Sequence, residues 1–225
     1  MQHSEPLLFK QLLKIDIVSD ISCPWCIISY RQLAEALKQT NTTYELHWHP
    51  FEINPDMALD GKNLREHGAK KHNRTEQQVQ ESRNRMTAAG AEVGFEFNFN
   101  DDTLVHNTFN VHQLLYWANQ YGRTNDLKQA LFNAYFTNNR NLSKKSVLTD
   151  IAAEIGLDDA EALTILDEQR FAKEVRDSEQ HWREQGIQSV PAVIFNDRHL
   201  VSGAQGVENY ISILKQLAEI SDYWC

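Results

Sequence analysis

Two cysteines three positions apart, Cys23 and Cys26, are the residues whose types and spacing could do chemistry. They follow an apolar, strand-like run (residues 12–18) and precede a helix-like run (residues 27–37). If Cys23 starts that helix, Cys26 lies one turn later on the same face, with the two Cβ atoms roughly 5–6 Å apart. A modest adjustment of this geometry allows a disulfide bond to form. The spacing therefore indicates a dithiol that can be oxidised and reduced.

The position of each thiol predicts its role. The first turn of a helix leaves backbone N–H groups unpaired and carries the positive end of the helix dipole, which favours a thiolate on Cys23 over the thiol. We therefore expect Cys23 to be the nucleophile. Cys26 lies one turn inside the helix, next to Ile27, so it should be the more buried thiol that resolves mixed disulfides.

The two residues between the cysteines suit an active-site motif at a helix start. Pro24 fits the first turn, because that position needs no amide donor and the proline ring presets a helical φ. Trp25 puts a large ring beside the sulfurs, with one indole donor and no titratable group. Thiol chemistry at such a motif needs no metal and no bound cofactor.

The strands next to the dithiol follow from the hydrophobic periodicity. Apolar residues alternate with others at 13–18 and again at 44–48, where Pro50 closes the run, and the helical pattern lies between the two. A strand, a helix and a second strand in succession form a βαβ unit, in which the two strands are parallel.

The C-terminal part returns to a period of two after Gly186. Residues 192–195 and 199–201 predict an antiparallel hairpin, and residues 206–218 predict a closing helix with one apolar face. The turn of the hairpin is Asn196-Asp197.

Helical patterns dominate the segment between these two parts. Thr75 and Gln78 form a capping box, and Asp158 with Glu161 marks another helix start. The helices that we expect here cover residues 75–90, 104–121, 127–138, 146–155, 158–167 and 171–185. The predicted fold is therefore α/β, with the order β-α-β, a helical block, then β-β-α.

Composition excludes several classes of protein. The chain of 225 residues is 41% hydrophobic and 24% charged, as is ordinary for a globular protein. Its net charge of −9 argues against nucleic acid or an anionic membrane as the main partner. The apolar patch at residues 7–9 is too short for the core of a signal peptide, and nothing later approaches a membrane span. We expect a cytoplasmic location, where a lone Cys-x-x-C is more often catalytic or metal-binding than structural.

Three further side chains could take part in chemistry. Asp16 interrupts an apolar strand, and if it is buried near the dithiol it could relay a proton to Cys26; at the strand's edge it would stay in solvent. His47 and His49 lie on one strand face and could complete a zinc set with the cysteines. Zinc ligands usually come as compact pairs on loops, however, and these histidines fit a solvated strand face as well. We predict no metal site.

The third cysteine, Cys225, is most simply a free, exposed thiol. The sequence leaves the oligomeric state open, since an apolar helix face looks the same whether it packs inside the chain or against a second copy.

Several short motifs match one known family. They are Ser19-Asp20, Cys23-Pro24-Trp25-Cys26, Pro50-Phe51-Glu52, Asn107-Thr108, His112, Ala134-Tyr135-Phe136, Ser189-Val190-Pro191-Ala192 and Ser202-Gly203-Ala204-Gln205. On these residues the chain resembles the DsbA-like branch of the thioredoxin superfamily, and more closely its FrnE-like members. The resemblance implies a thioredoxin fold (residues 10–55 and 187–220) that is interrupted by an all-helical insertion domain (residues 60–185).

The same resemblance implies site residues beyond the dithiol. Val190–Pro191 would be a cis peptide that faces the cysteines, with the backbone before the proline pairing with bound substrate. Asp20 belongs to the matching motif, and Asn107 and His112 would face the active site across the groove of the insertion, although a polar helix face explains both equally well.

Trp25 is a departure from the family pattern. The periplasmic oxidases carry a histidine between their cysteines, and its absence here removes a cation that would stabilise the Cys23 thiolate. Because a stabilised thiolate favours the reduced form, we expect a weaker oxidant than those enzymes.

The resemblance implies a thiol-disulfide oxidoreductase. Its partners would be protein or small thiols and disulfides together with a cellular reductant or oxidant, and its redox group the Cys23–Cys26 disulfide. One alternative is a glutathione-dependent isomerase or transferase, similar to 2-hydroxychromene-2-carboxylate isomerases and kappa-class glutathione transferases. These use glutathione as co-substrate and usually carry serine where Cys23 stands. The other alternative is a chaperone-like module that binds polypeptides in an apolar groove of the insertion.

Overall fold

A four-stranded sheet lies at the centre of the computed structural model, which describes residues 12–58 and 61–223. Its strand order is β2-β1-β5-β6. The strands are β1 (Leu13–Ser19), β2 (Tyr44–Pro50), β5 (Ala192–Phe195) and β6 (His199–Ser202). β1 pairs with β2 in parallel and with β5 antiparallel, and β5 and β6 form the predicted hairpin. The predicted α/β fold is confirmed.

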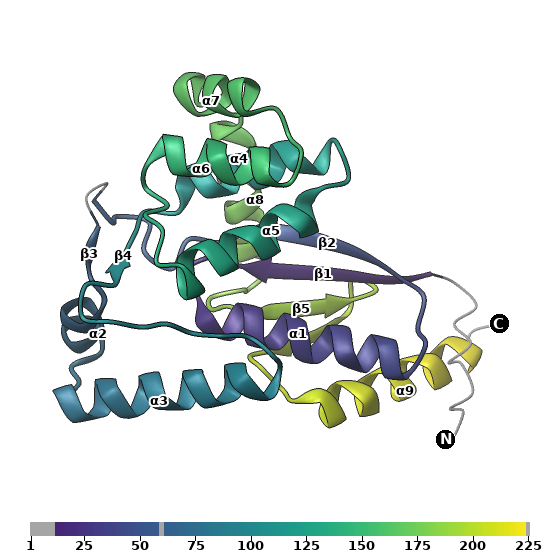
Figure 1. Ribbon diagram of the computed structural model, residues 1–225. Helices are drawn as coiled ribbons and strands as arrows, with labels where there is room; N and C mark the ends of the chain where they lie inside the picture. The colour runs from purple at the N-terminus through teal and green to yellow at the C-terminus, as the bar shows by residue number, and fades with distance from the viewer. Residues whose placement is uncertain (1–11, 59–60, 224–225) are drawn as a thin grey trace.

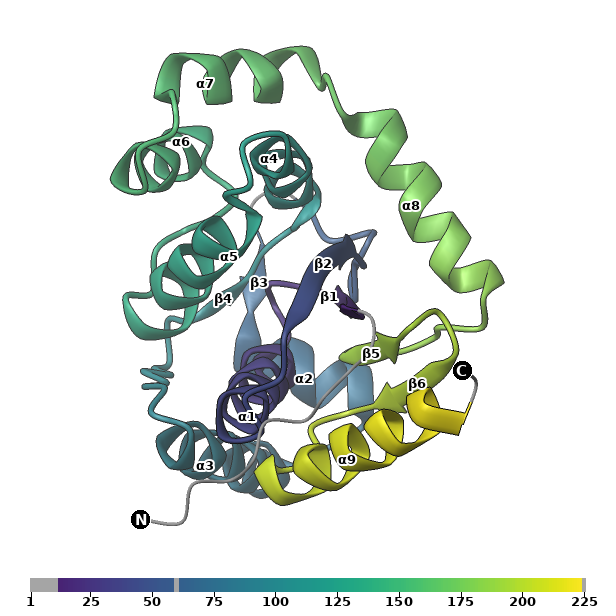
Figure 2. The same ribbon diagram turned by 90° about the vertical axis from the view of Figure 1, so that its right-hand side faces the viewer.

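Helices cover both faces of the sheet (Figures 1 and 2). α1 (Pro24–Gln39) and α9 (Val207–Tyr223) lie together on one side. There Leu33 and Tyr210 pack against Ile15 and Ile17 of β1. The opposite side of β1 presents Val18 to a second apolar cluster that borders α8 (Ala172–Glu184). β1 is therefore buried on both faces, which explains its nearly continuous apolar sequence.

The insertion between β2 and β5 is mainly helical. Besides α8 it contains α2 (Leu64–His72), α3 (Glu76–Glu92), α4 (Phe109–Asn119), α5 (Thr124–Phe132), a π-helical turn (Asn133–Thr137), α6 (Lys145–Glu154) and α7 (Asp159–Glu168). The capping box of Thr75 and Gln78 and the Asp158 cap are both present. The boundaries of an insertion domain at residues 60 and 185 stay a prediction.

Two predictions about the insertion are wrong. Residues 104–121 do not form one helix, because Leu104–Val105 is a short strand, β4, paired with β3 (Lys62–Asn63). The insertion is therefore not all-helical. α4 starts only at Phe109, whose N–H donates to the Asn107 side chain at 3.0 Å in a local turn. Gly61 has φ +71°, and a Cβ there would lie 2.6 Å from the carbonyl oxygen of Val105, so the approach to β4 requires glycine.

The helix that carries the dithiol is buried between two apolar cores. One face of α1 packs on the sheet and α9, while Cys26, Ile27 and Ile28 belong to the core of the insertion. Because both cores hold α1, the start of this helix is fixed relative to the sheet and to the insertion.

Two sequence predictions concern the ends of the chain. The apolar patch at residues 7–9 and Cys225 lie outside the described residues. Among the residues that are described, no helix has the length and apolar character to span a membrane.

Truncating Leu33 tests the packing of α1 on the sheet. Leu33 is 1% exposed, so Leu33→Ala should lower the free energy of unfolding by roughly 2–5 kcal/mol, through lost burial and the cavity left behind. Leu200→Ala is the matched control, since Leu200 is 51% exposed and its truncation should cost less than about 0.5 kcal/mol. Urea unfolding measures both, and equal losses would contradict the described packing.

Candidate active site

Cys23 is the N-cap residue of α1. Its backbone is extended (φ −94°, ψ 109°), and Pro24 is the first helical residue. The N–H of Cys26 donates to the carbonyl of Cys23 at 3.1 Å, which closes the first turn. The predicted helix start at the dithiol is confirmed, with Pro24 where its missing N–H costs no helical hydrogen bond. Both cysteines are free thiols.

The two sulfurs differ in access. Cys23 borders a cleft of about 470 Å³, together with Pro24 and Trp25. Trp25 is 38% exposed, whereas Cys26 is 0% exposed and does not line this cleft. Cys23, although only 5% exposed, is therefore the sulfur that a molecule in the cleft can reach.

The loop before β5 faces the dithiol. The Val190–Pro191 peptide bond is cis, as predicted. The Cys23 Sγ lies 3.7 Å from the carbonyl oxygen of Val190, within the range of a weak thiol hydrogen bond. The two groups are 167 positions apart in the chain, and the pairing of β1 with β5 brings them together.

The electrostatics of the sulfur pair differ from the expectation. Donation of a hydrogen bond to Cys26, together with burial, raises the pKa of the Cys23 thiol well above its usual value. Burial would also raise the pKa of Cys26, but the hydrogen bond from Cys23, the nearby Ser19 hydroxyl and the ammonium of Lys128 lower it overall. The groups around the inner sulfur therefore favour its charged form more than the groups around Cys23 do.

Lys128 is a residue of this site that the sequence analysis missed. It lies on α5 of the insertion and is 1% exposed. Its ammonium lies 5.2 Å from the ring centroid of Trp48 and 5.4 Å from that of Phe132. Burial lowers the pKa of Lys128 to about 8, although the two cysteines and Asp20 attract its charge. A charged residue inside the apolar run from Leu127 to Phe132 was the available signal.

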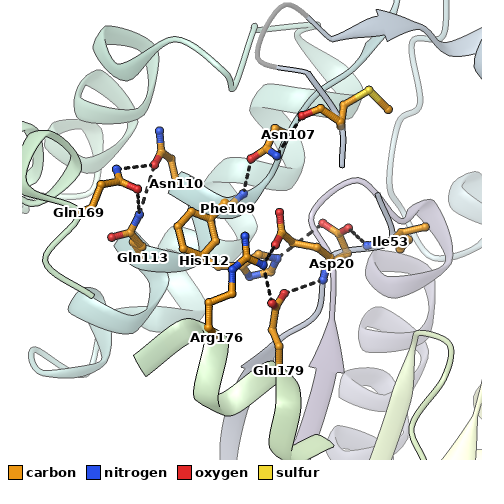
Figure 3. A network of polar contacts seen from close by, with 12 residues as sticks. Asp20, Ile53, Asn107, Phe109, Asn110, His112, Gln113, Gln169, Arg176 and Glu179 are labelled. Atoms are coloured by element: carbon orange, nitrogen blue, oxygen red, sulfur yellow. Dashed lines mark hydrogen bonds and ion pairs between the residues drawn. The ribbon is translucent and has the colours of Figure 1, made fainter. Parts of the chain in front are cut away.

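Asp20 is a fully buried carboxylate three positions before Cys23, and Figure 3 shows its contacts with Ile53 and His112. Its oxygens accept hydrogen bonds from the N–H groups of Ser22 (3.1 Å) and Ile53 (2.8 Å). The Nε2 of His112 lies 3.7 Å from Oδ1, an ion-pair contact rather than a hydrogen bond. Burial alone would raise the pKa of Asp20, but His112 and the two N–H donors lower it. The structure therefore brings Asp20 and His112 together at the base of the site.

Asp16 is buried, but other groups occupy its carboxylate. His49 Nε2 lies 2.7 Å from Oδ1 and Lys14 Nζ lies 3.3 Å from Oδ2. Burial works to raise the pKa of Asp16, and His49 and Lys14 together lower it. The groups that act on the Cys26 sulfur include the backbone of Asp20 and the ammonium of Lys128, and Asp16 is not among them.

Asn107 has a structural role in the turn before α4. Its amide donates to the carbonyl of Met57 at 3.1 Å and accepts from Phe109. Figure 3 shows the dashed contacts of Asn107 apart from those of Asp20 and His112. Asn107 thus fixes the loop after β2 rather than a group at the sulfurs.

A buried carboxylate pair extends the polar network toward α8. The N–H of Glu52 donates to Glu179 at 2.9 Å, and Arg176 forms ion pairs with both carboxylates. Burial and the charge of Glu179 raise the pKa of Glu52. Arg176 and Glu179 were not predicted, because they face Glu52 only once α8 packs beside β2 (Figure 3).

The histidines of the zinc alternative bind other groups. His47 lies 3.2 Å from Glu45, and His49 pairs with Asp16. Among the described residues, no three or more histidine, cysteine, aspartate or glutamate side chains gather as metal ligands.

Comparisons with known proteins place this geometry in context. A family model described as a DSBA-like thioredoxin domain matches residues 14–215. The chain is 26% identical over 195 residues to the uncharacterised protein YwbO of Bacillus subtilis (strain 168), covering 85% of this chain and 90% of YwbO.

Solved structures extend the likeness. The probable DsbA oxidoreductase SCO1869 from Streptomyces coelicolor has a TM-score of 0.85 and 28% identity, over 91% of this chain and 89% of that one. The cytosolic disulfide reductase DsbM from Pseudomonas aeruginosa, solved with GSH, has a TM-score of 0.62 and 14% identity, over 92% and 99%. At that identity the second likeness concerns the fold alone.

Lys128→Met tests the cost of burying the ammonium. Below about pH 8 both the folded and the unfolded chain are protonated, so the folded state bears the full cost. Between about pH 8 and the ordinary lysine pKa of about 10.4, only the unfolded chain is protonated, and stability rises with pH. The variant should therefore be more stable at pH 7, by up to about 3 kcal/mol, and the gain should shrink toward pH 10.

Thermal unfolding of the reduced protein at several pH values measures this difference. Lys215→Met, which removes an exposed lysine from α9, should shift stability by less than about 0.5 kcal/mol at every pH. The ultraviolet absorbance of the thiolate should also titrate at higher pH in Lys128→Met, because Cys26 loses a stabilising cation. A pH-independent gain and an unchanged thiolate titration would contradict the described environment of Lys128.

Proposed function

Because the chain belongs to the family of DSBA-like thioredoxin domains, we propose that it is a thiol-disulfide oxidoreductase that works through Cys23 and Cys26. The observation that supports this most is the position of the Cys23 Sγ. It caps α1, borders the cleft and lies 3.7 Å from the Val190 carbonyl. Reactive thiols occur at such helix starts.

The first step needs a thiolate on Cys23. Since the pKa of Cys26 is lowered and that of Cys23 is raised, Cys26 accepts the Cys23 proton as Cys23 attacks. A bond forms between the Cys23 Sγ and one substrate sulfur while the substrate disulfide breaks. The leaving thiolate takes a proton from solvent, and a mixed disulfide remains on Cys23.

The second step resolves that mixed disulfide. Cys26 gives its proton to solvent, and its thiolate attacks the Cys23 Sγ to form the Cys23–Cys26 disulfide. The second substrate sulfur leaves as a thiolate, which takes a proton from solvent. Lys128 and the Ser19 hydroxyl support the step because they favour the charged form of Cys26. In the reverse direction, a substrate thiolate opens the Cys23–Cys26 disulfide, so the redox partner decides the direction.

Backbone groups next to the sulfur would position the substrate. Val190 offers its main chain beside Cys23, and an extended substrate segment pairs there with its scissile sulfur directed at the Sγ. Trp25 lies at the rim of the cleft and supplies no cation, in keeping with a weaker oxidant than the periplasmic oxidases.

The cellular setting is part of the same proposal. We place the protein in the cytoplasm, as an FrnE-like member that uses no bound cofactor and depends on a cellular thiol reductant or oxidant. The fold neighbour DsbM is a cytosolic disulfide reductase, which is in keeping with this setting.

Cys23→Ser tests the reaction directly. Both proteins carry Cys225→Ser, so that only the dithiol can react. The protein that keeps Cys23 and Cys26 should reduce insulin disulfides. Cys23→Ser should lower the rate of insulin reduction at least about 10³-fold, since a serine hydroxyl is not a thiolate at neutral pH. Equal rates for both proteins would refute the proposal. Isomerase activity with glutathione that survives Cys23→Ser would instead support the glutathione-dependent alternative.

Cys26→Ala tests the order of the two sulfurs. Without a resolving thiol the mixed disulfide on Cys23 should accumulate, and mass spectrometry of the reacted protein should find a substrate adduct that dithiothreitol removes. The matched variant Cys23→Ala should form little adduct, because Cys26 is inaccessible from the cleft. An adduct on Cys26 alone would reverse the assignment. Suppression of aggregation by a variant lacking both cysteines would indicate the chaperone-like alternative.

A further inference from the structure

The cleft beside Cys23 is positively charged. Its titratable walls, apart from Cys23 itself, are His67 and Lys71 of α2, Arg74 after α2, and Arg83 and Arg85 of α3. None of the described residues that line it is acidic, although the whole chain carries a net charge of −9. A local concentration of cations on an acidic protein indicates selection for an anion at this position.

Arg83 is the residue that distinguishes this cleft from a solvated basic surface. The side chain is 7% exposed, and its Nε and Nη2 are buried without a hydrogen-bond partner among the described residues. Arg83 also lines a second hollow, together with Asp101. The Asp101 side chain is highly exposed, and its carboxylate lies 3.8 Å from the guanidinium of Arg65. Buried guanidinium donors normally have acceptors, and a carboxylate fits two of them at once.

The neighbouring cation is fixed next to the dithiol loop. Lys71 Nζ donates to the carbonyl of Ile53 at 3.0 Å and to the Asn54 side chain at 2.6 Å. The N–H of Ile53 in turn donates to Asp20, behind the sulfurs. The charged wall of the cleft and the reactive end of α1 are therefore held in one arrangement.

The remaining walls suit the organic part of a small molecule. Trp25, Leu64, Val79 and Met86 provide apolar surface, and the volume of about 470 Å³ is in the range of small-molecule sites.

We propose that this cleft selects a low-molecular-weight disulfide that carries carboxylates, with Arg83 as the residue that binds the carboxylate and Cys23 as the attacking group. The inference rests on the proposed function and specifies its substrate. Cys23 attacks one sulfur and releases the first thiol, and Cys26 then releases the second. One disulfide becomes two thiols while the protein dithiol becomes a disulfide, which an external dithiol reductant reduces again.

The test compares two disulfides of the same skeleton. Glutathione disulfide carries free carboxylates, and its tetraethyl ester carries none. With dithiothreitol as reductant and the uncatalysed rate subtracted, kcat/KM for the acid should exceed that for the ester by at least about tenfold at low salt. The ratio should fall as ionic strength rises.

Arg83→Met should reduce this acid-to-ester ratio about tenfold or more, and Arg83→Lys should restore part of it because it keeps the charge without the planar fork. Arg198→Met removes an exposed arginine from the hairpin turn, outside the cleft, and should keep the wild-type ratio. Circular dichroism and thermal unfolding establish that each variant is folded before the ratio is compared.

A second pair of variants does not depend on the buried arginine. Gly68 of α2 lines the cleft, and a Cβ added there meets nothing within 4 Å. Gly68→Glu and Gly68→Gln therefore add side chains of equal size, of which only the first is negative. The acid-to-ester ratio should be lower in Gly68→Glu than in Gly68→Gln, even if Arg83→Met does not fold.

The outcomes separate this inference from the proposed function. Two results would refute the anion site and leave the proposed oxidoreductase intact. In the first, both disulfides are reduced in a Cys23-dependent way with an acid-to-ester ratio of kcat/KM near one. In the second, folded Arg83→Met and both Gly68 variants keep the wild-type ratio. If neither disulfide nor insulin is reduced in a Cys23-dependent way, the proposed function itself fails.

Discussion

The placement of the Cys23 and Cys26 sulfurs in the first turn of α1 is the constraint on which the rest of the site depends. It needs a helix that begins at Cys23, and α1 is held there by the sheet core on one face and by the core of the insertion on the other. Asp20 adds a fixed point, since its carboxylate accepts N–H groups from both Ser22 and Ile53. The reactive end of the helix is therefore rigid on its inner side and open only where Cys23 meets the cleft.

The charged groups near the sulfurs are buried on the inner side of the site, away from the cleft. Asp20 and Lys128 are both buried and of opposite sign, so each moderates the cost of burying the other. Lys128 favours the charge on Cys26, whereas the outer sulfur has a carbonyl and a cleft beside it. In the proposed reaction this division lets Cys23 meet the substrate while Cys26 accepts its proton. The fold supplies it by combining α5 of the insertion with the first turn of α1.

Features encoded within a few residues could be predicted from the sequence. The strand pattern before the dithiol, Pro24 in the first helical turn, the Thr75 capping box and the hairpin at Asn196 depend on local periodicity and local backbone preferences, and all are present. The cis bond before Pro191 followed from family resemblance rather than from any local signal. Arg83 could not be recognised, because its charge is unusual only once α3 packs beside the cleft, and Lys128 had only the weak signal of a charge among the apolar residues of α5. The strand at Leu104 was missed for the same reason, since its partner lies some 40 positions earlier.

The strand order gives the site a late assembly. β1 and α1 are made first, then the whole insertion, and only afterwards the strand β5 that fills the position next to β1 and brings Val190 to Cys23. A chain still being synthesised has therefore already made both sulfurs, Lys128 and the basic residues of the cleft before it makes the carbonyl that lies beside the outer thiol. A polypeptide that ends before Val190 has the dithiol without the main-chain group that would align a partner.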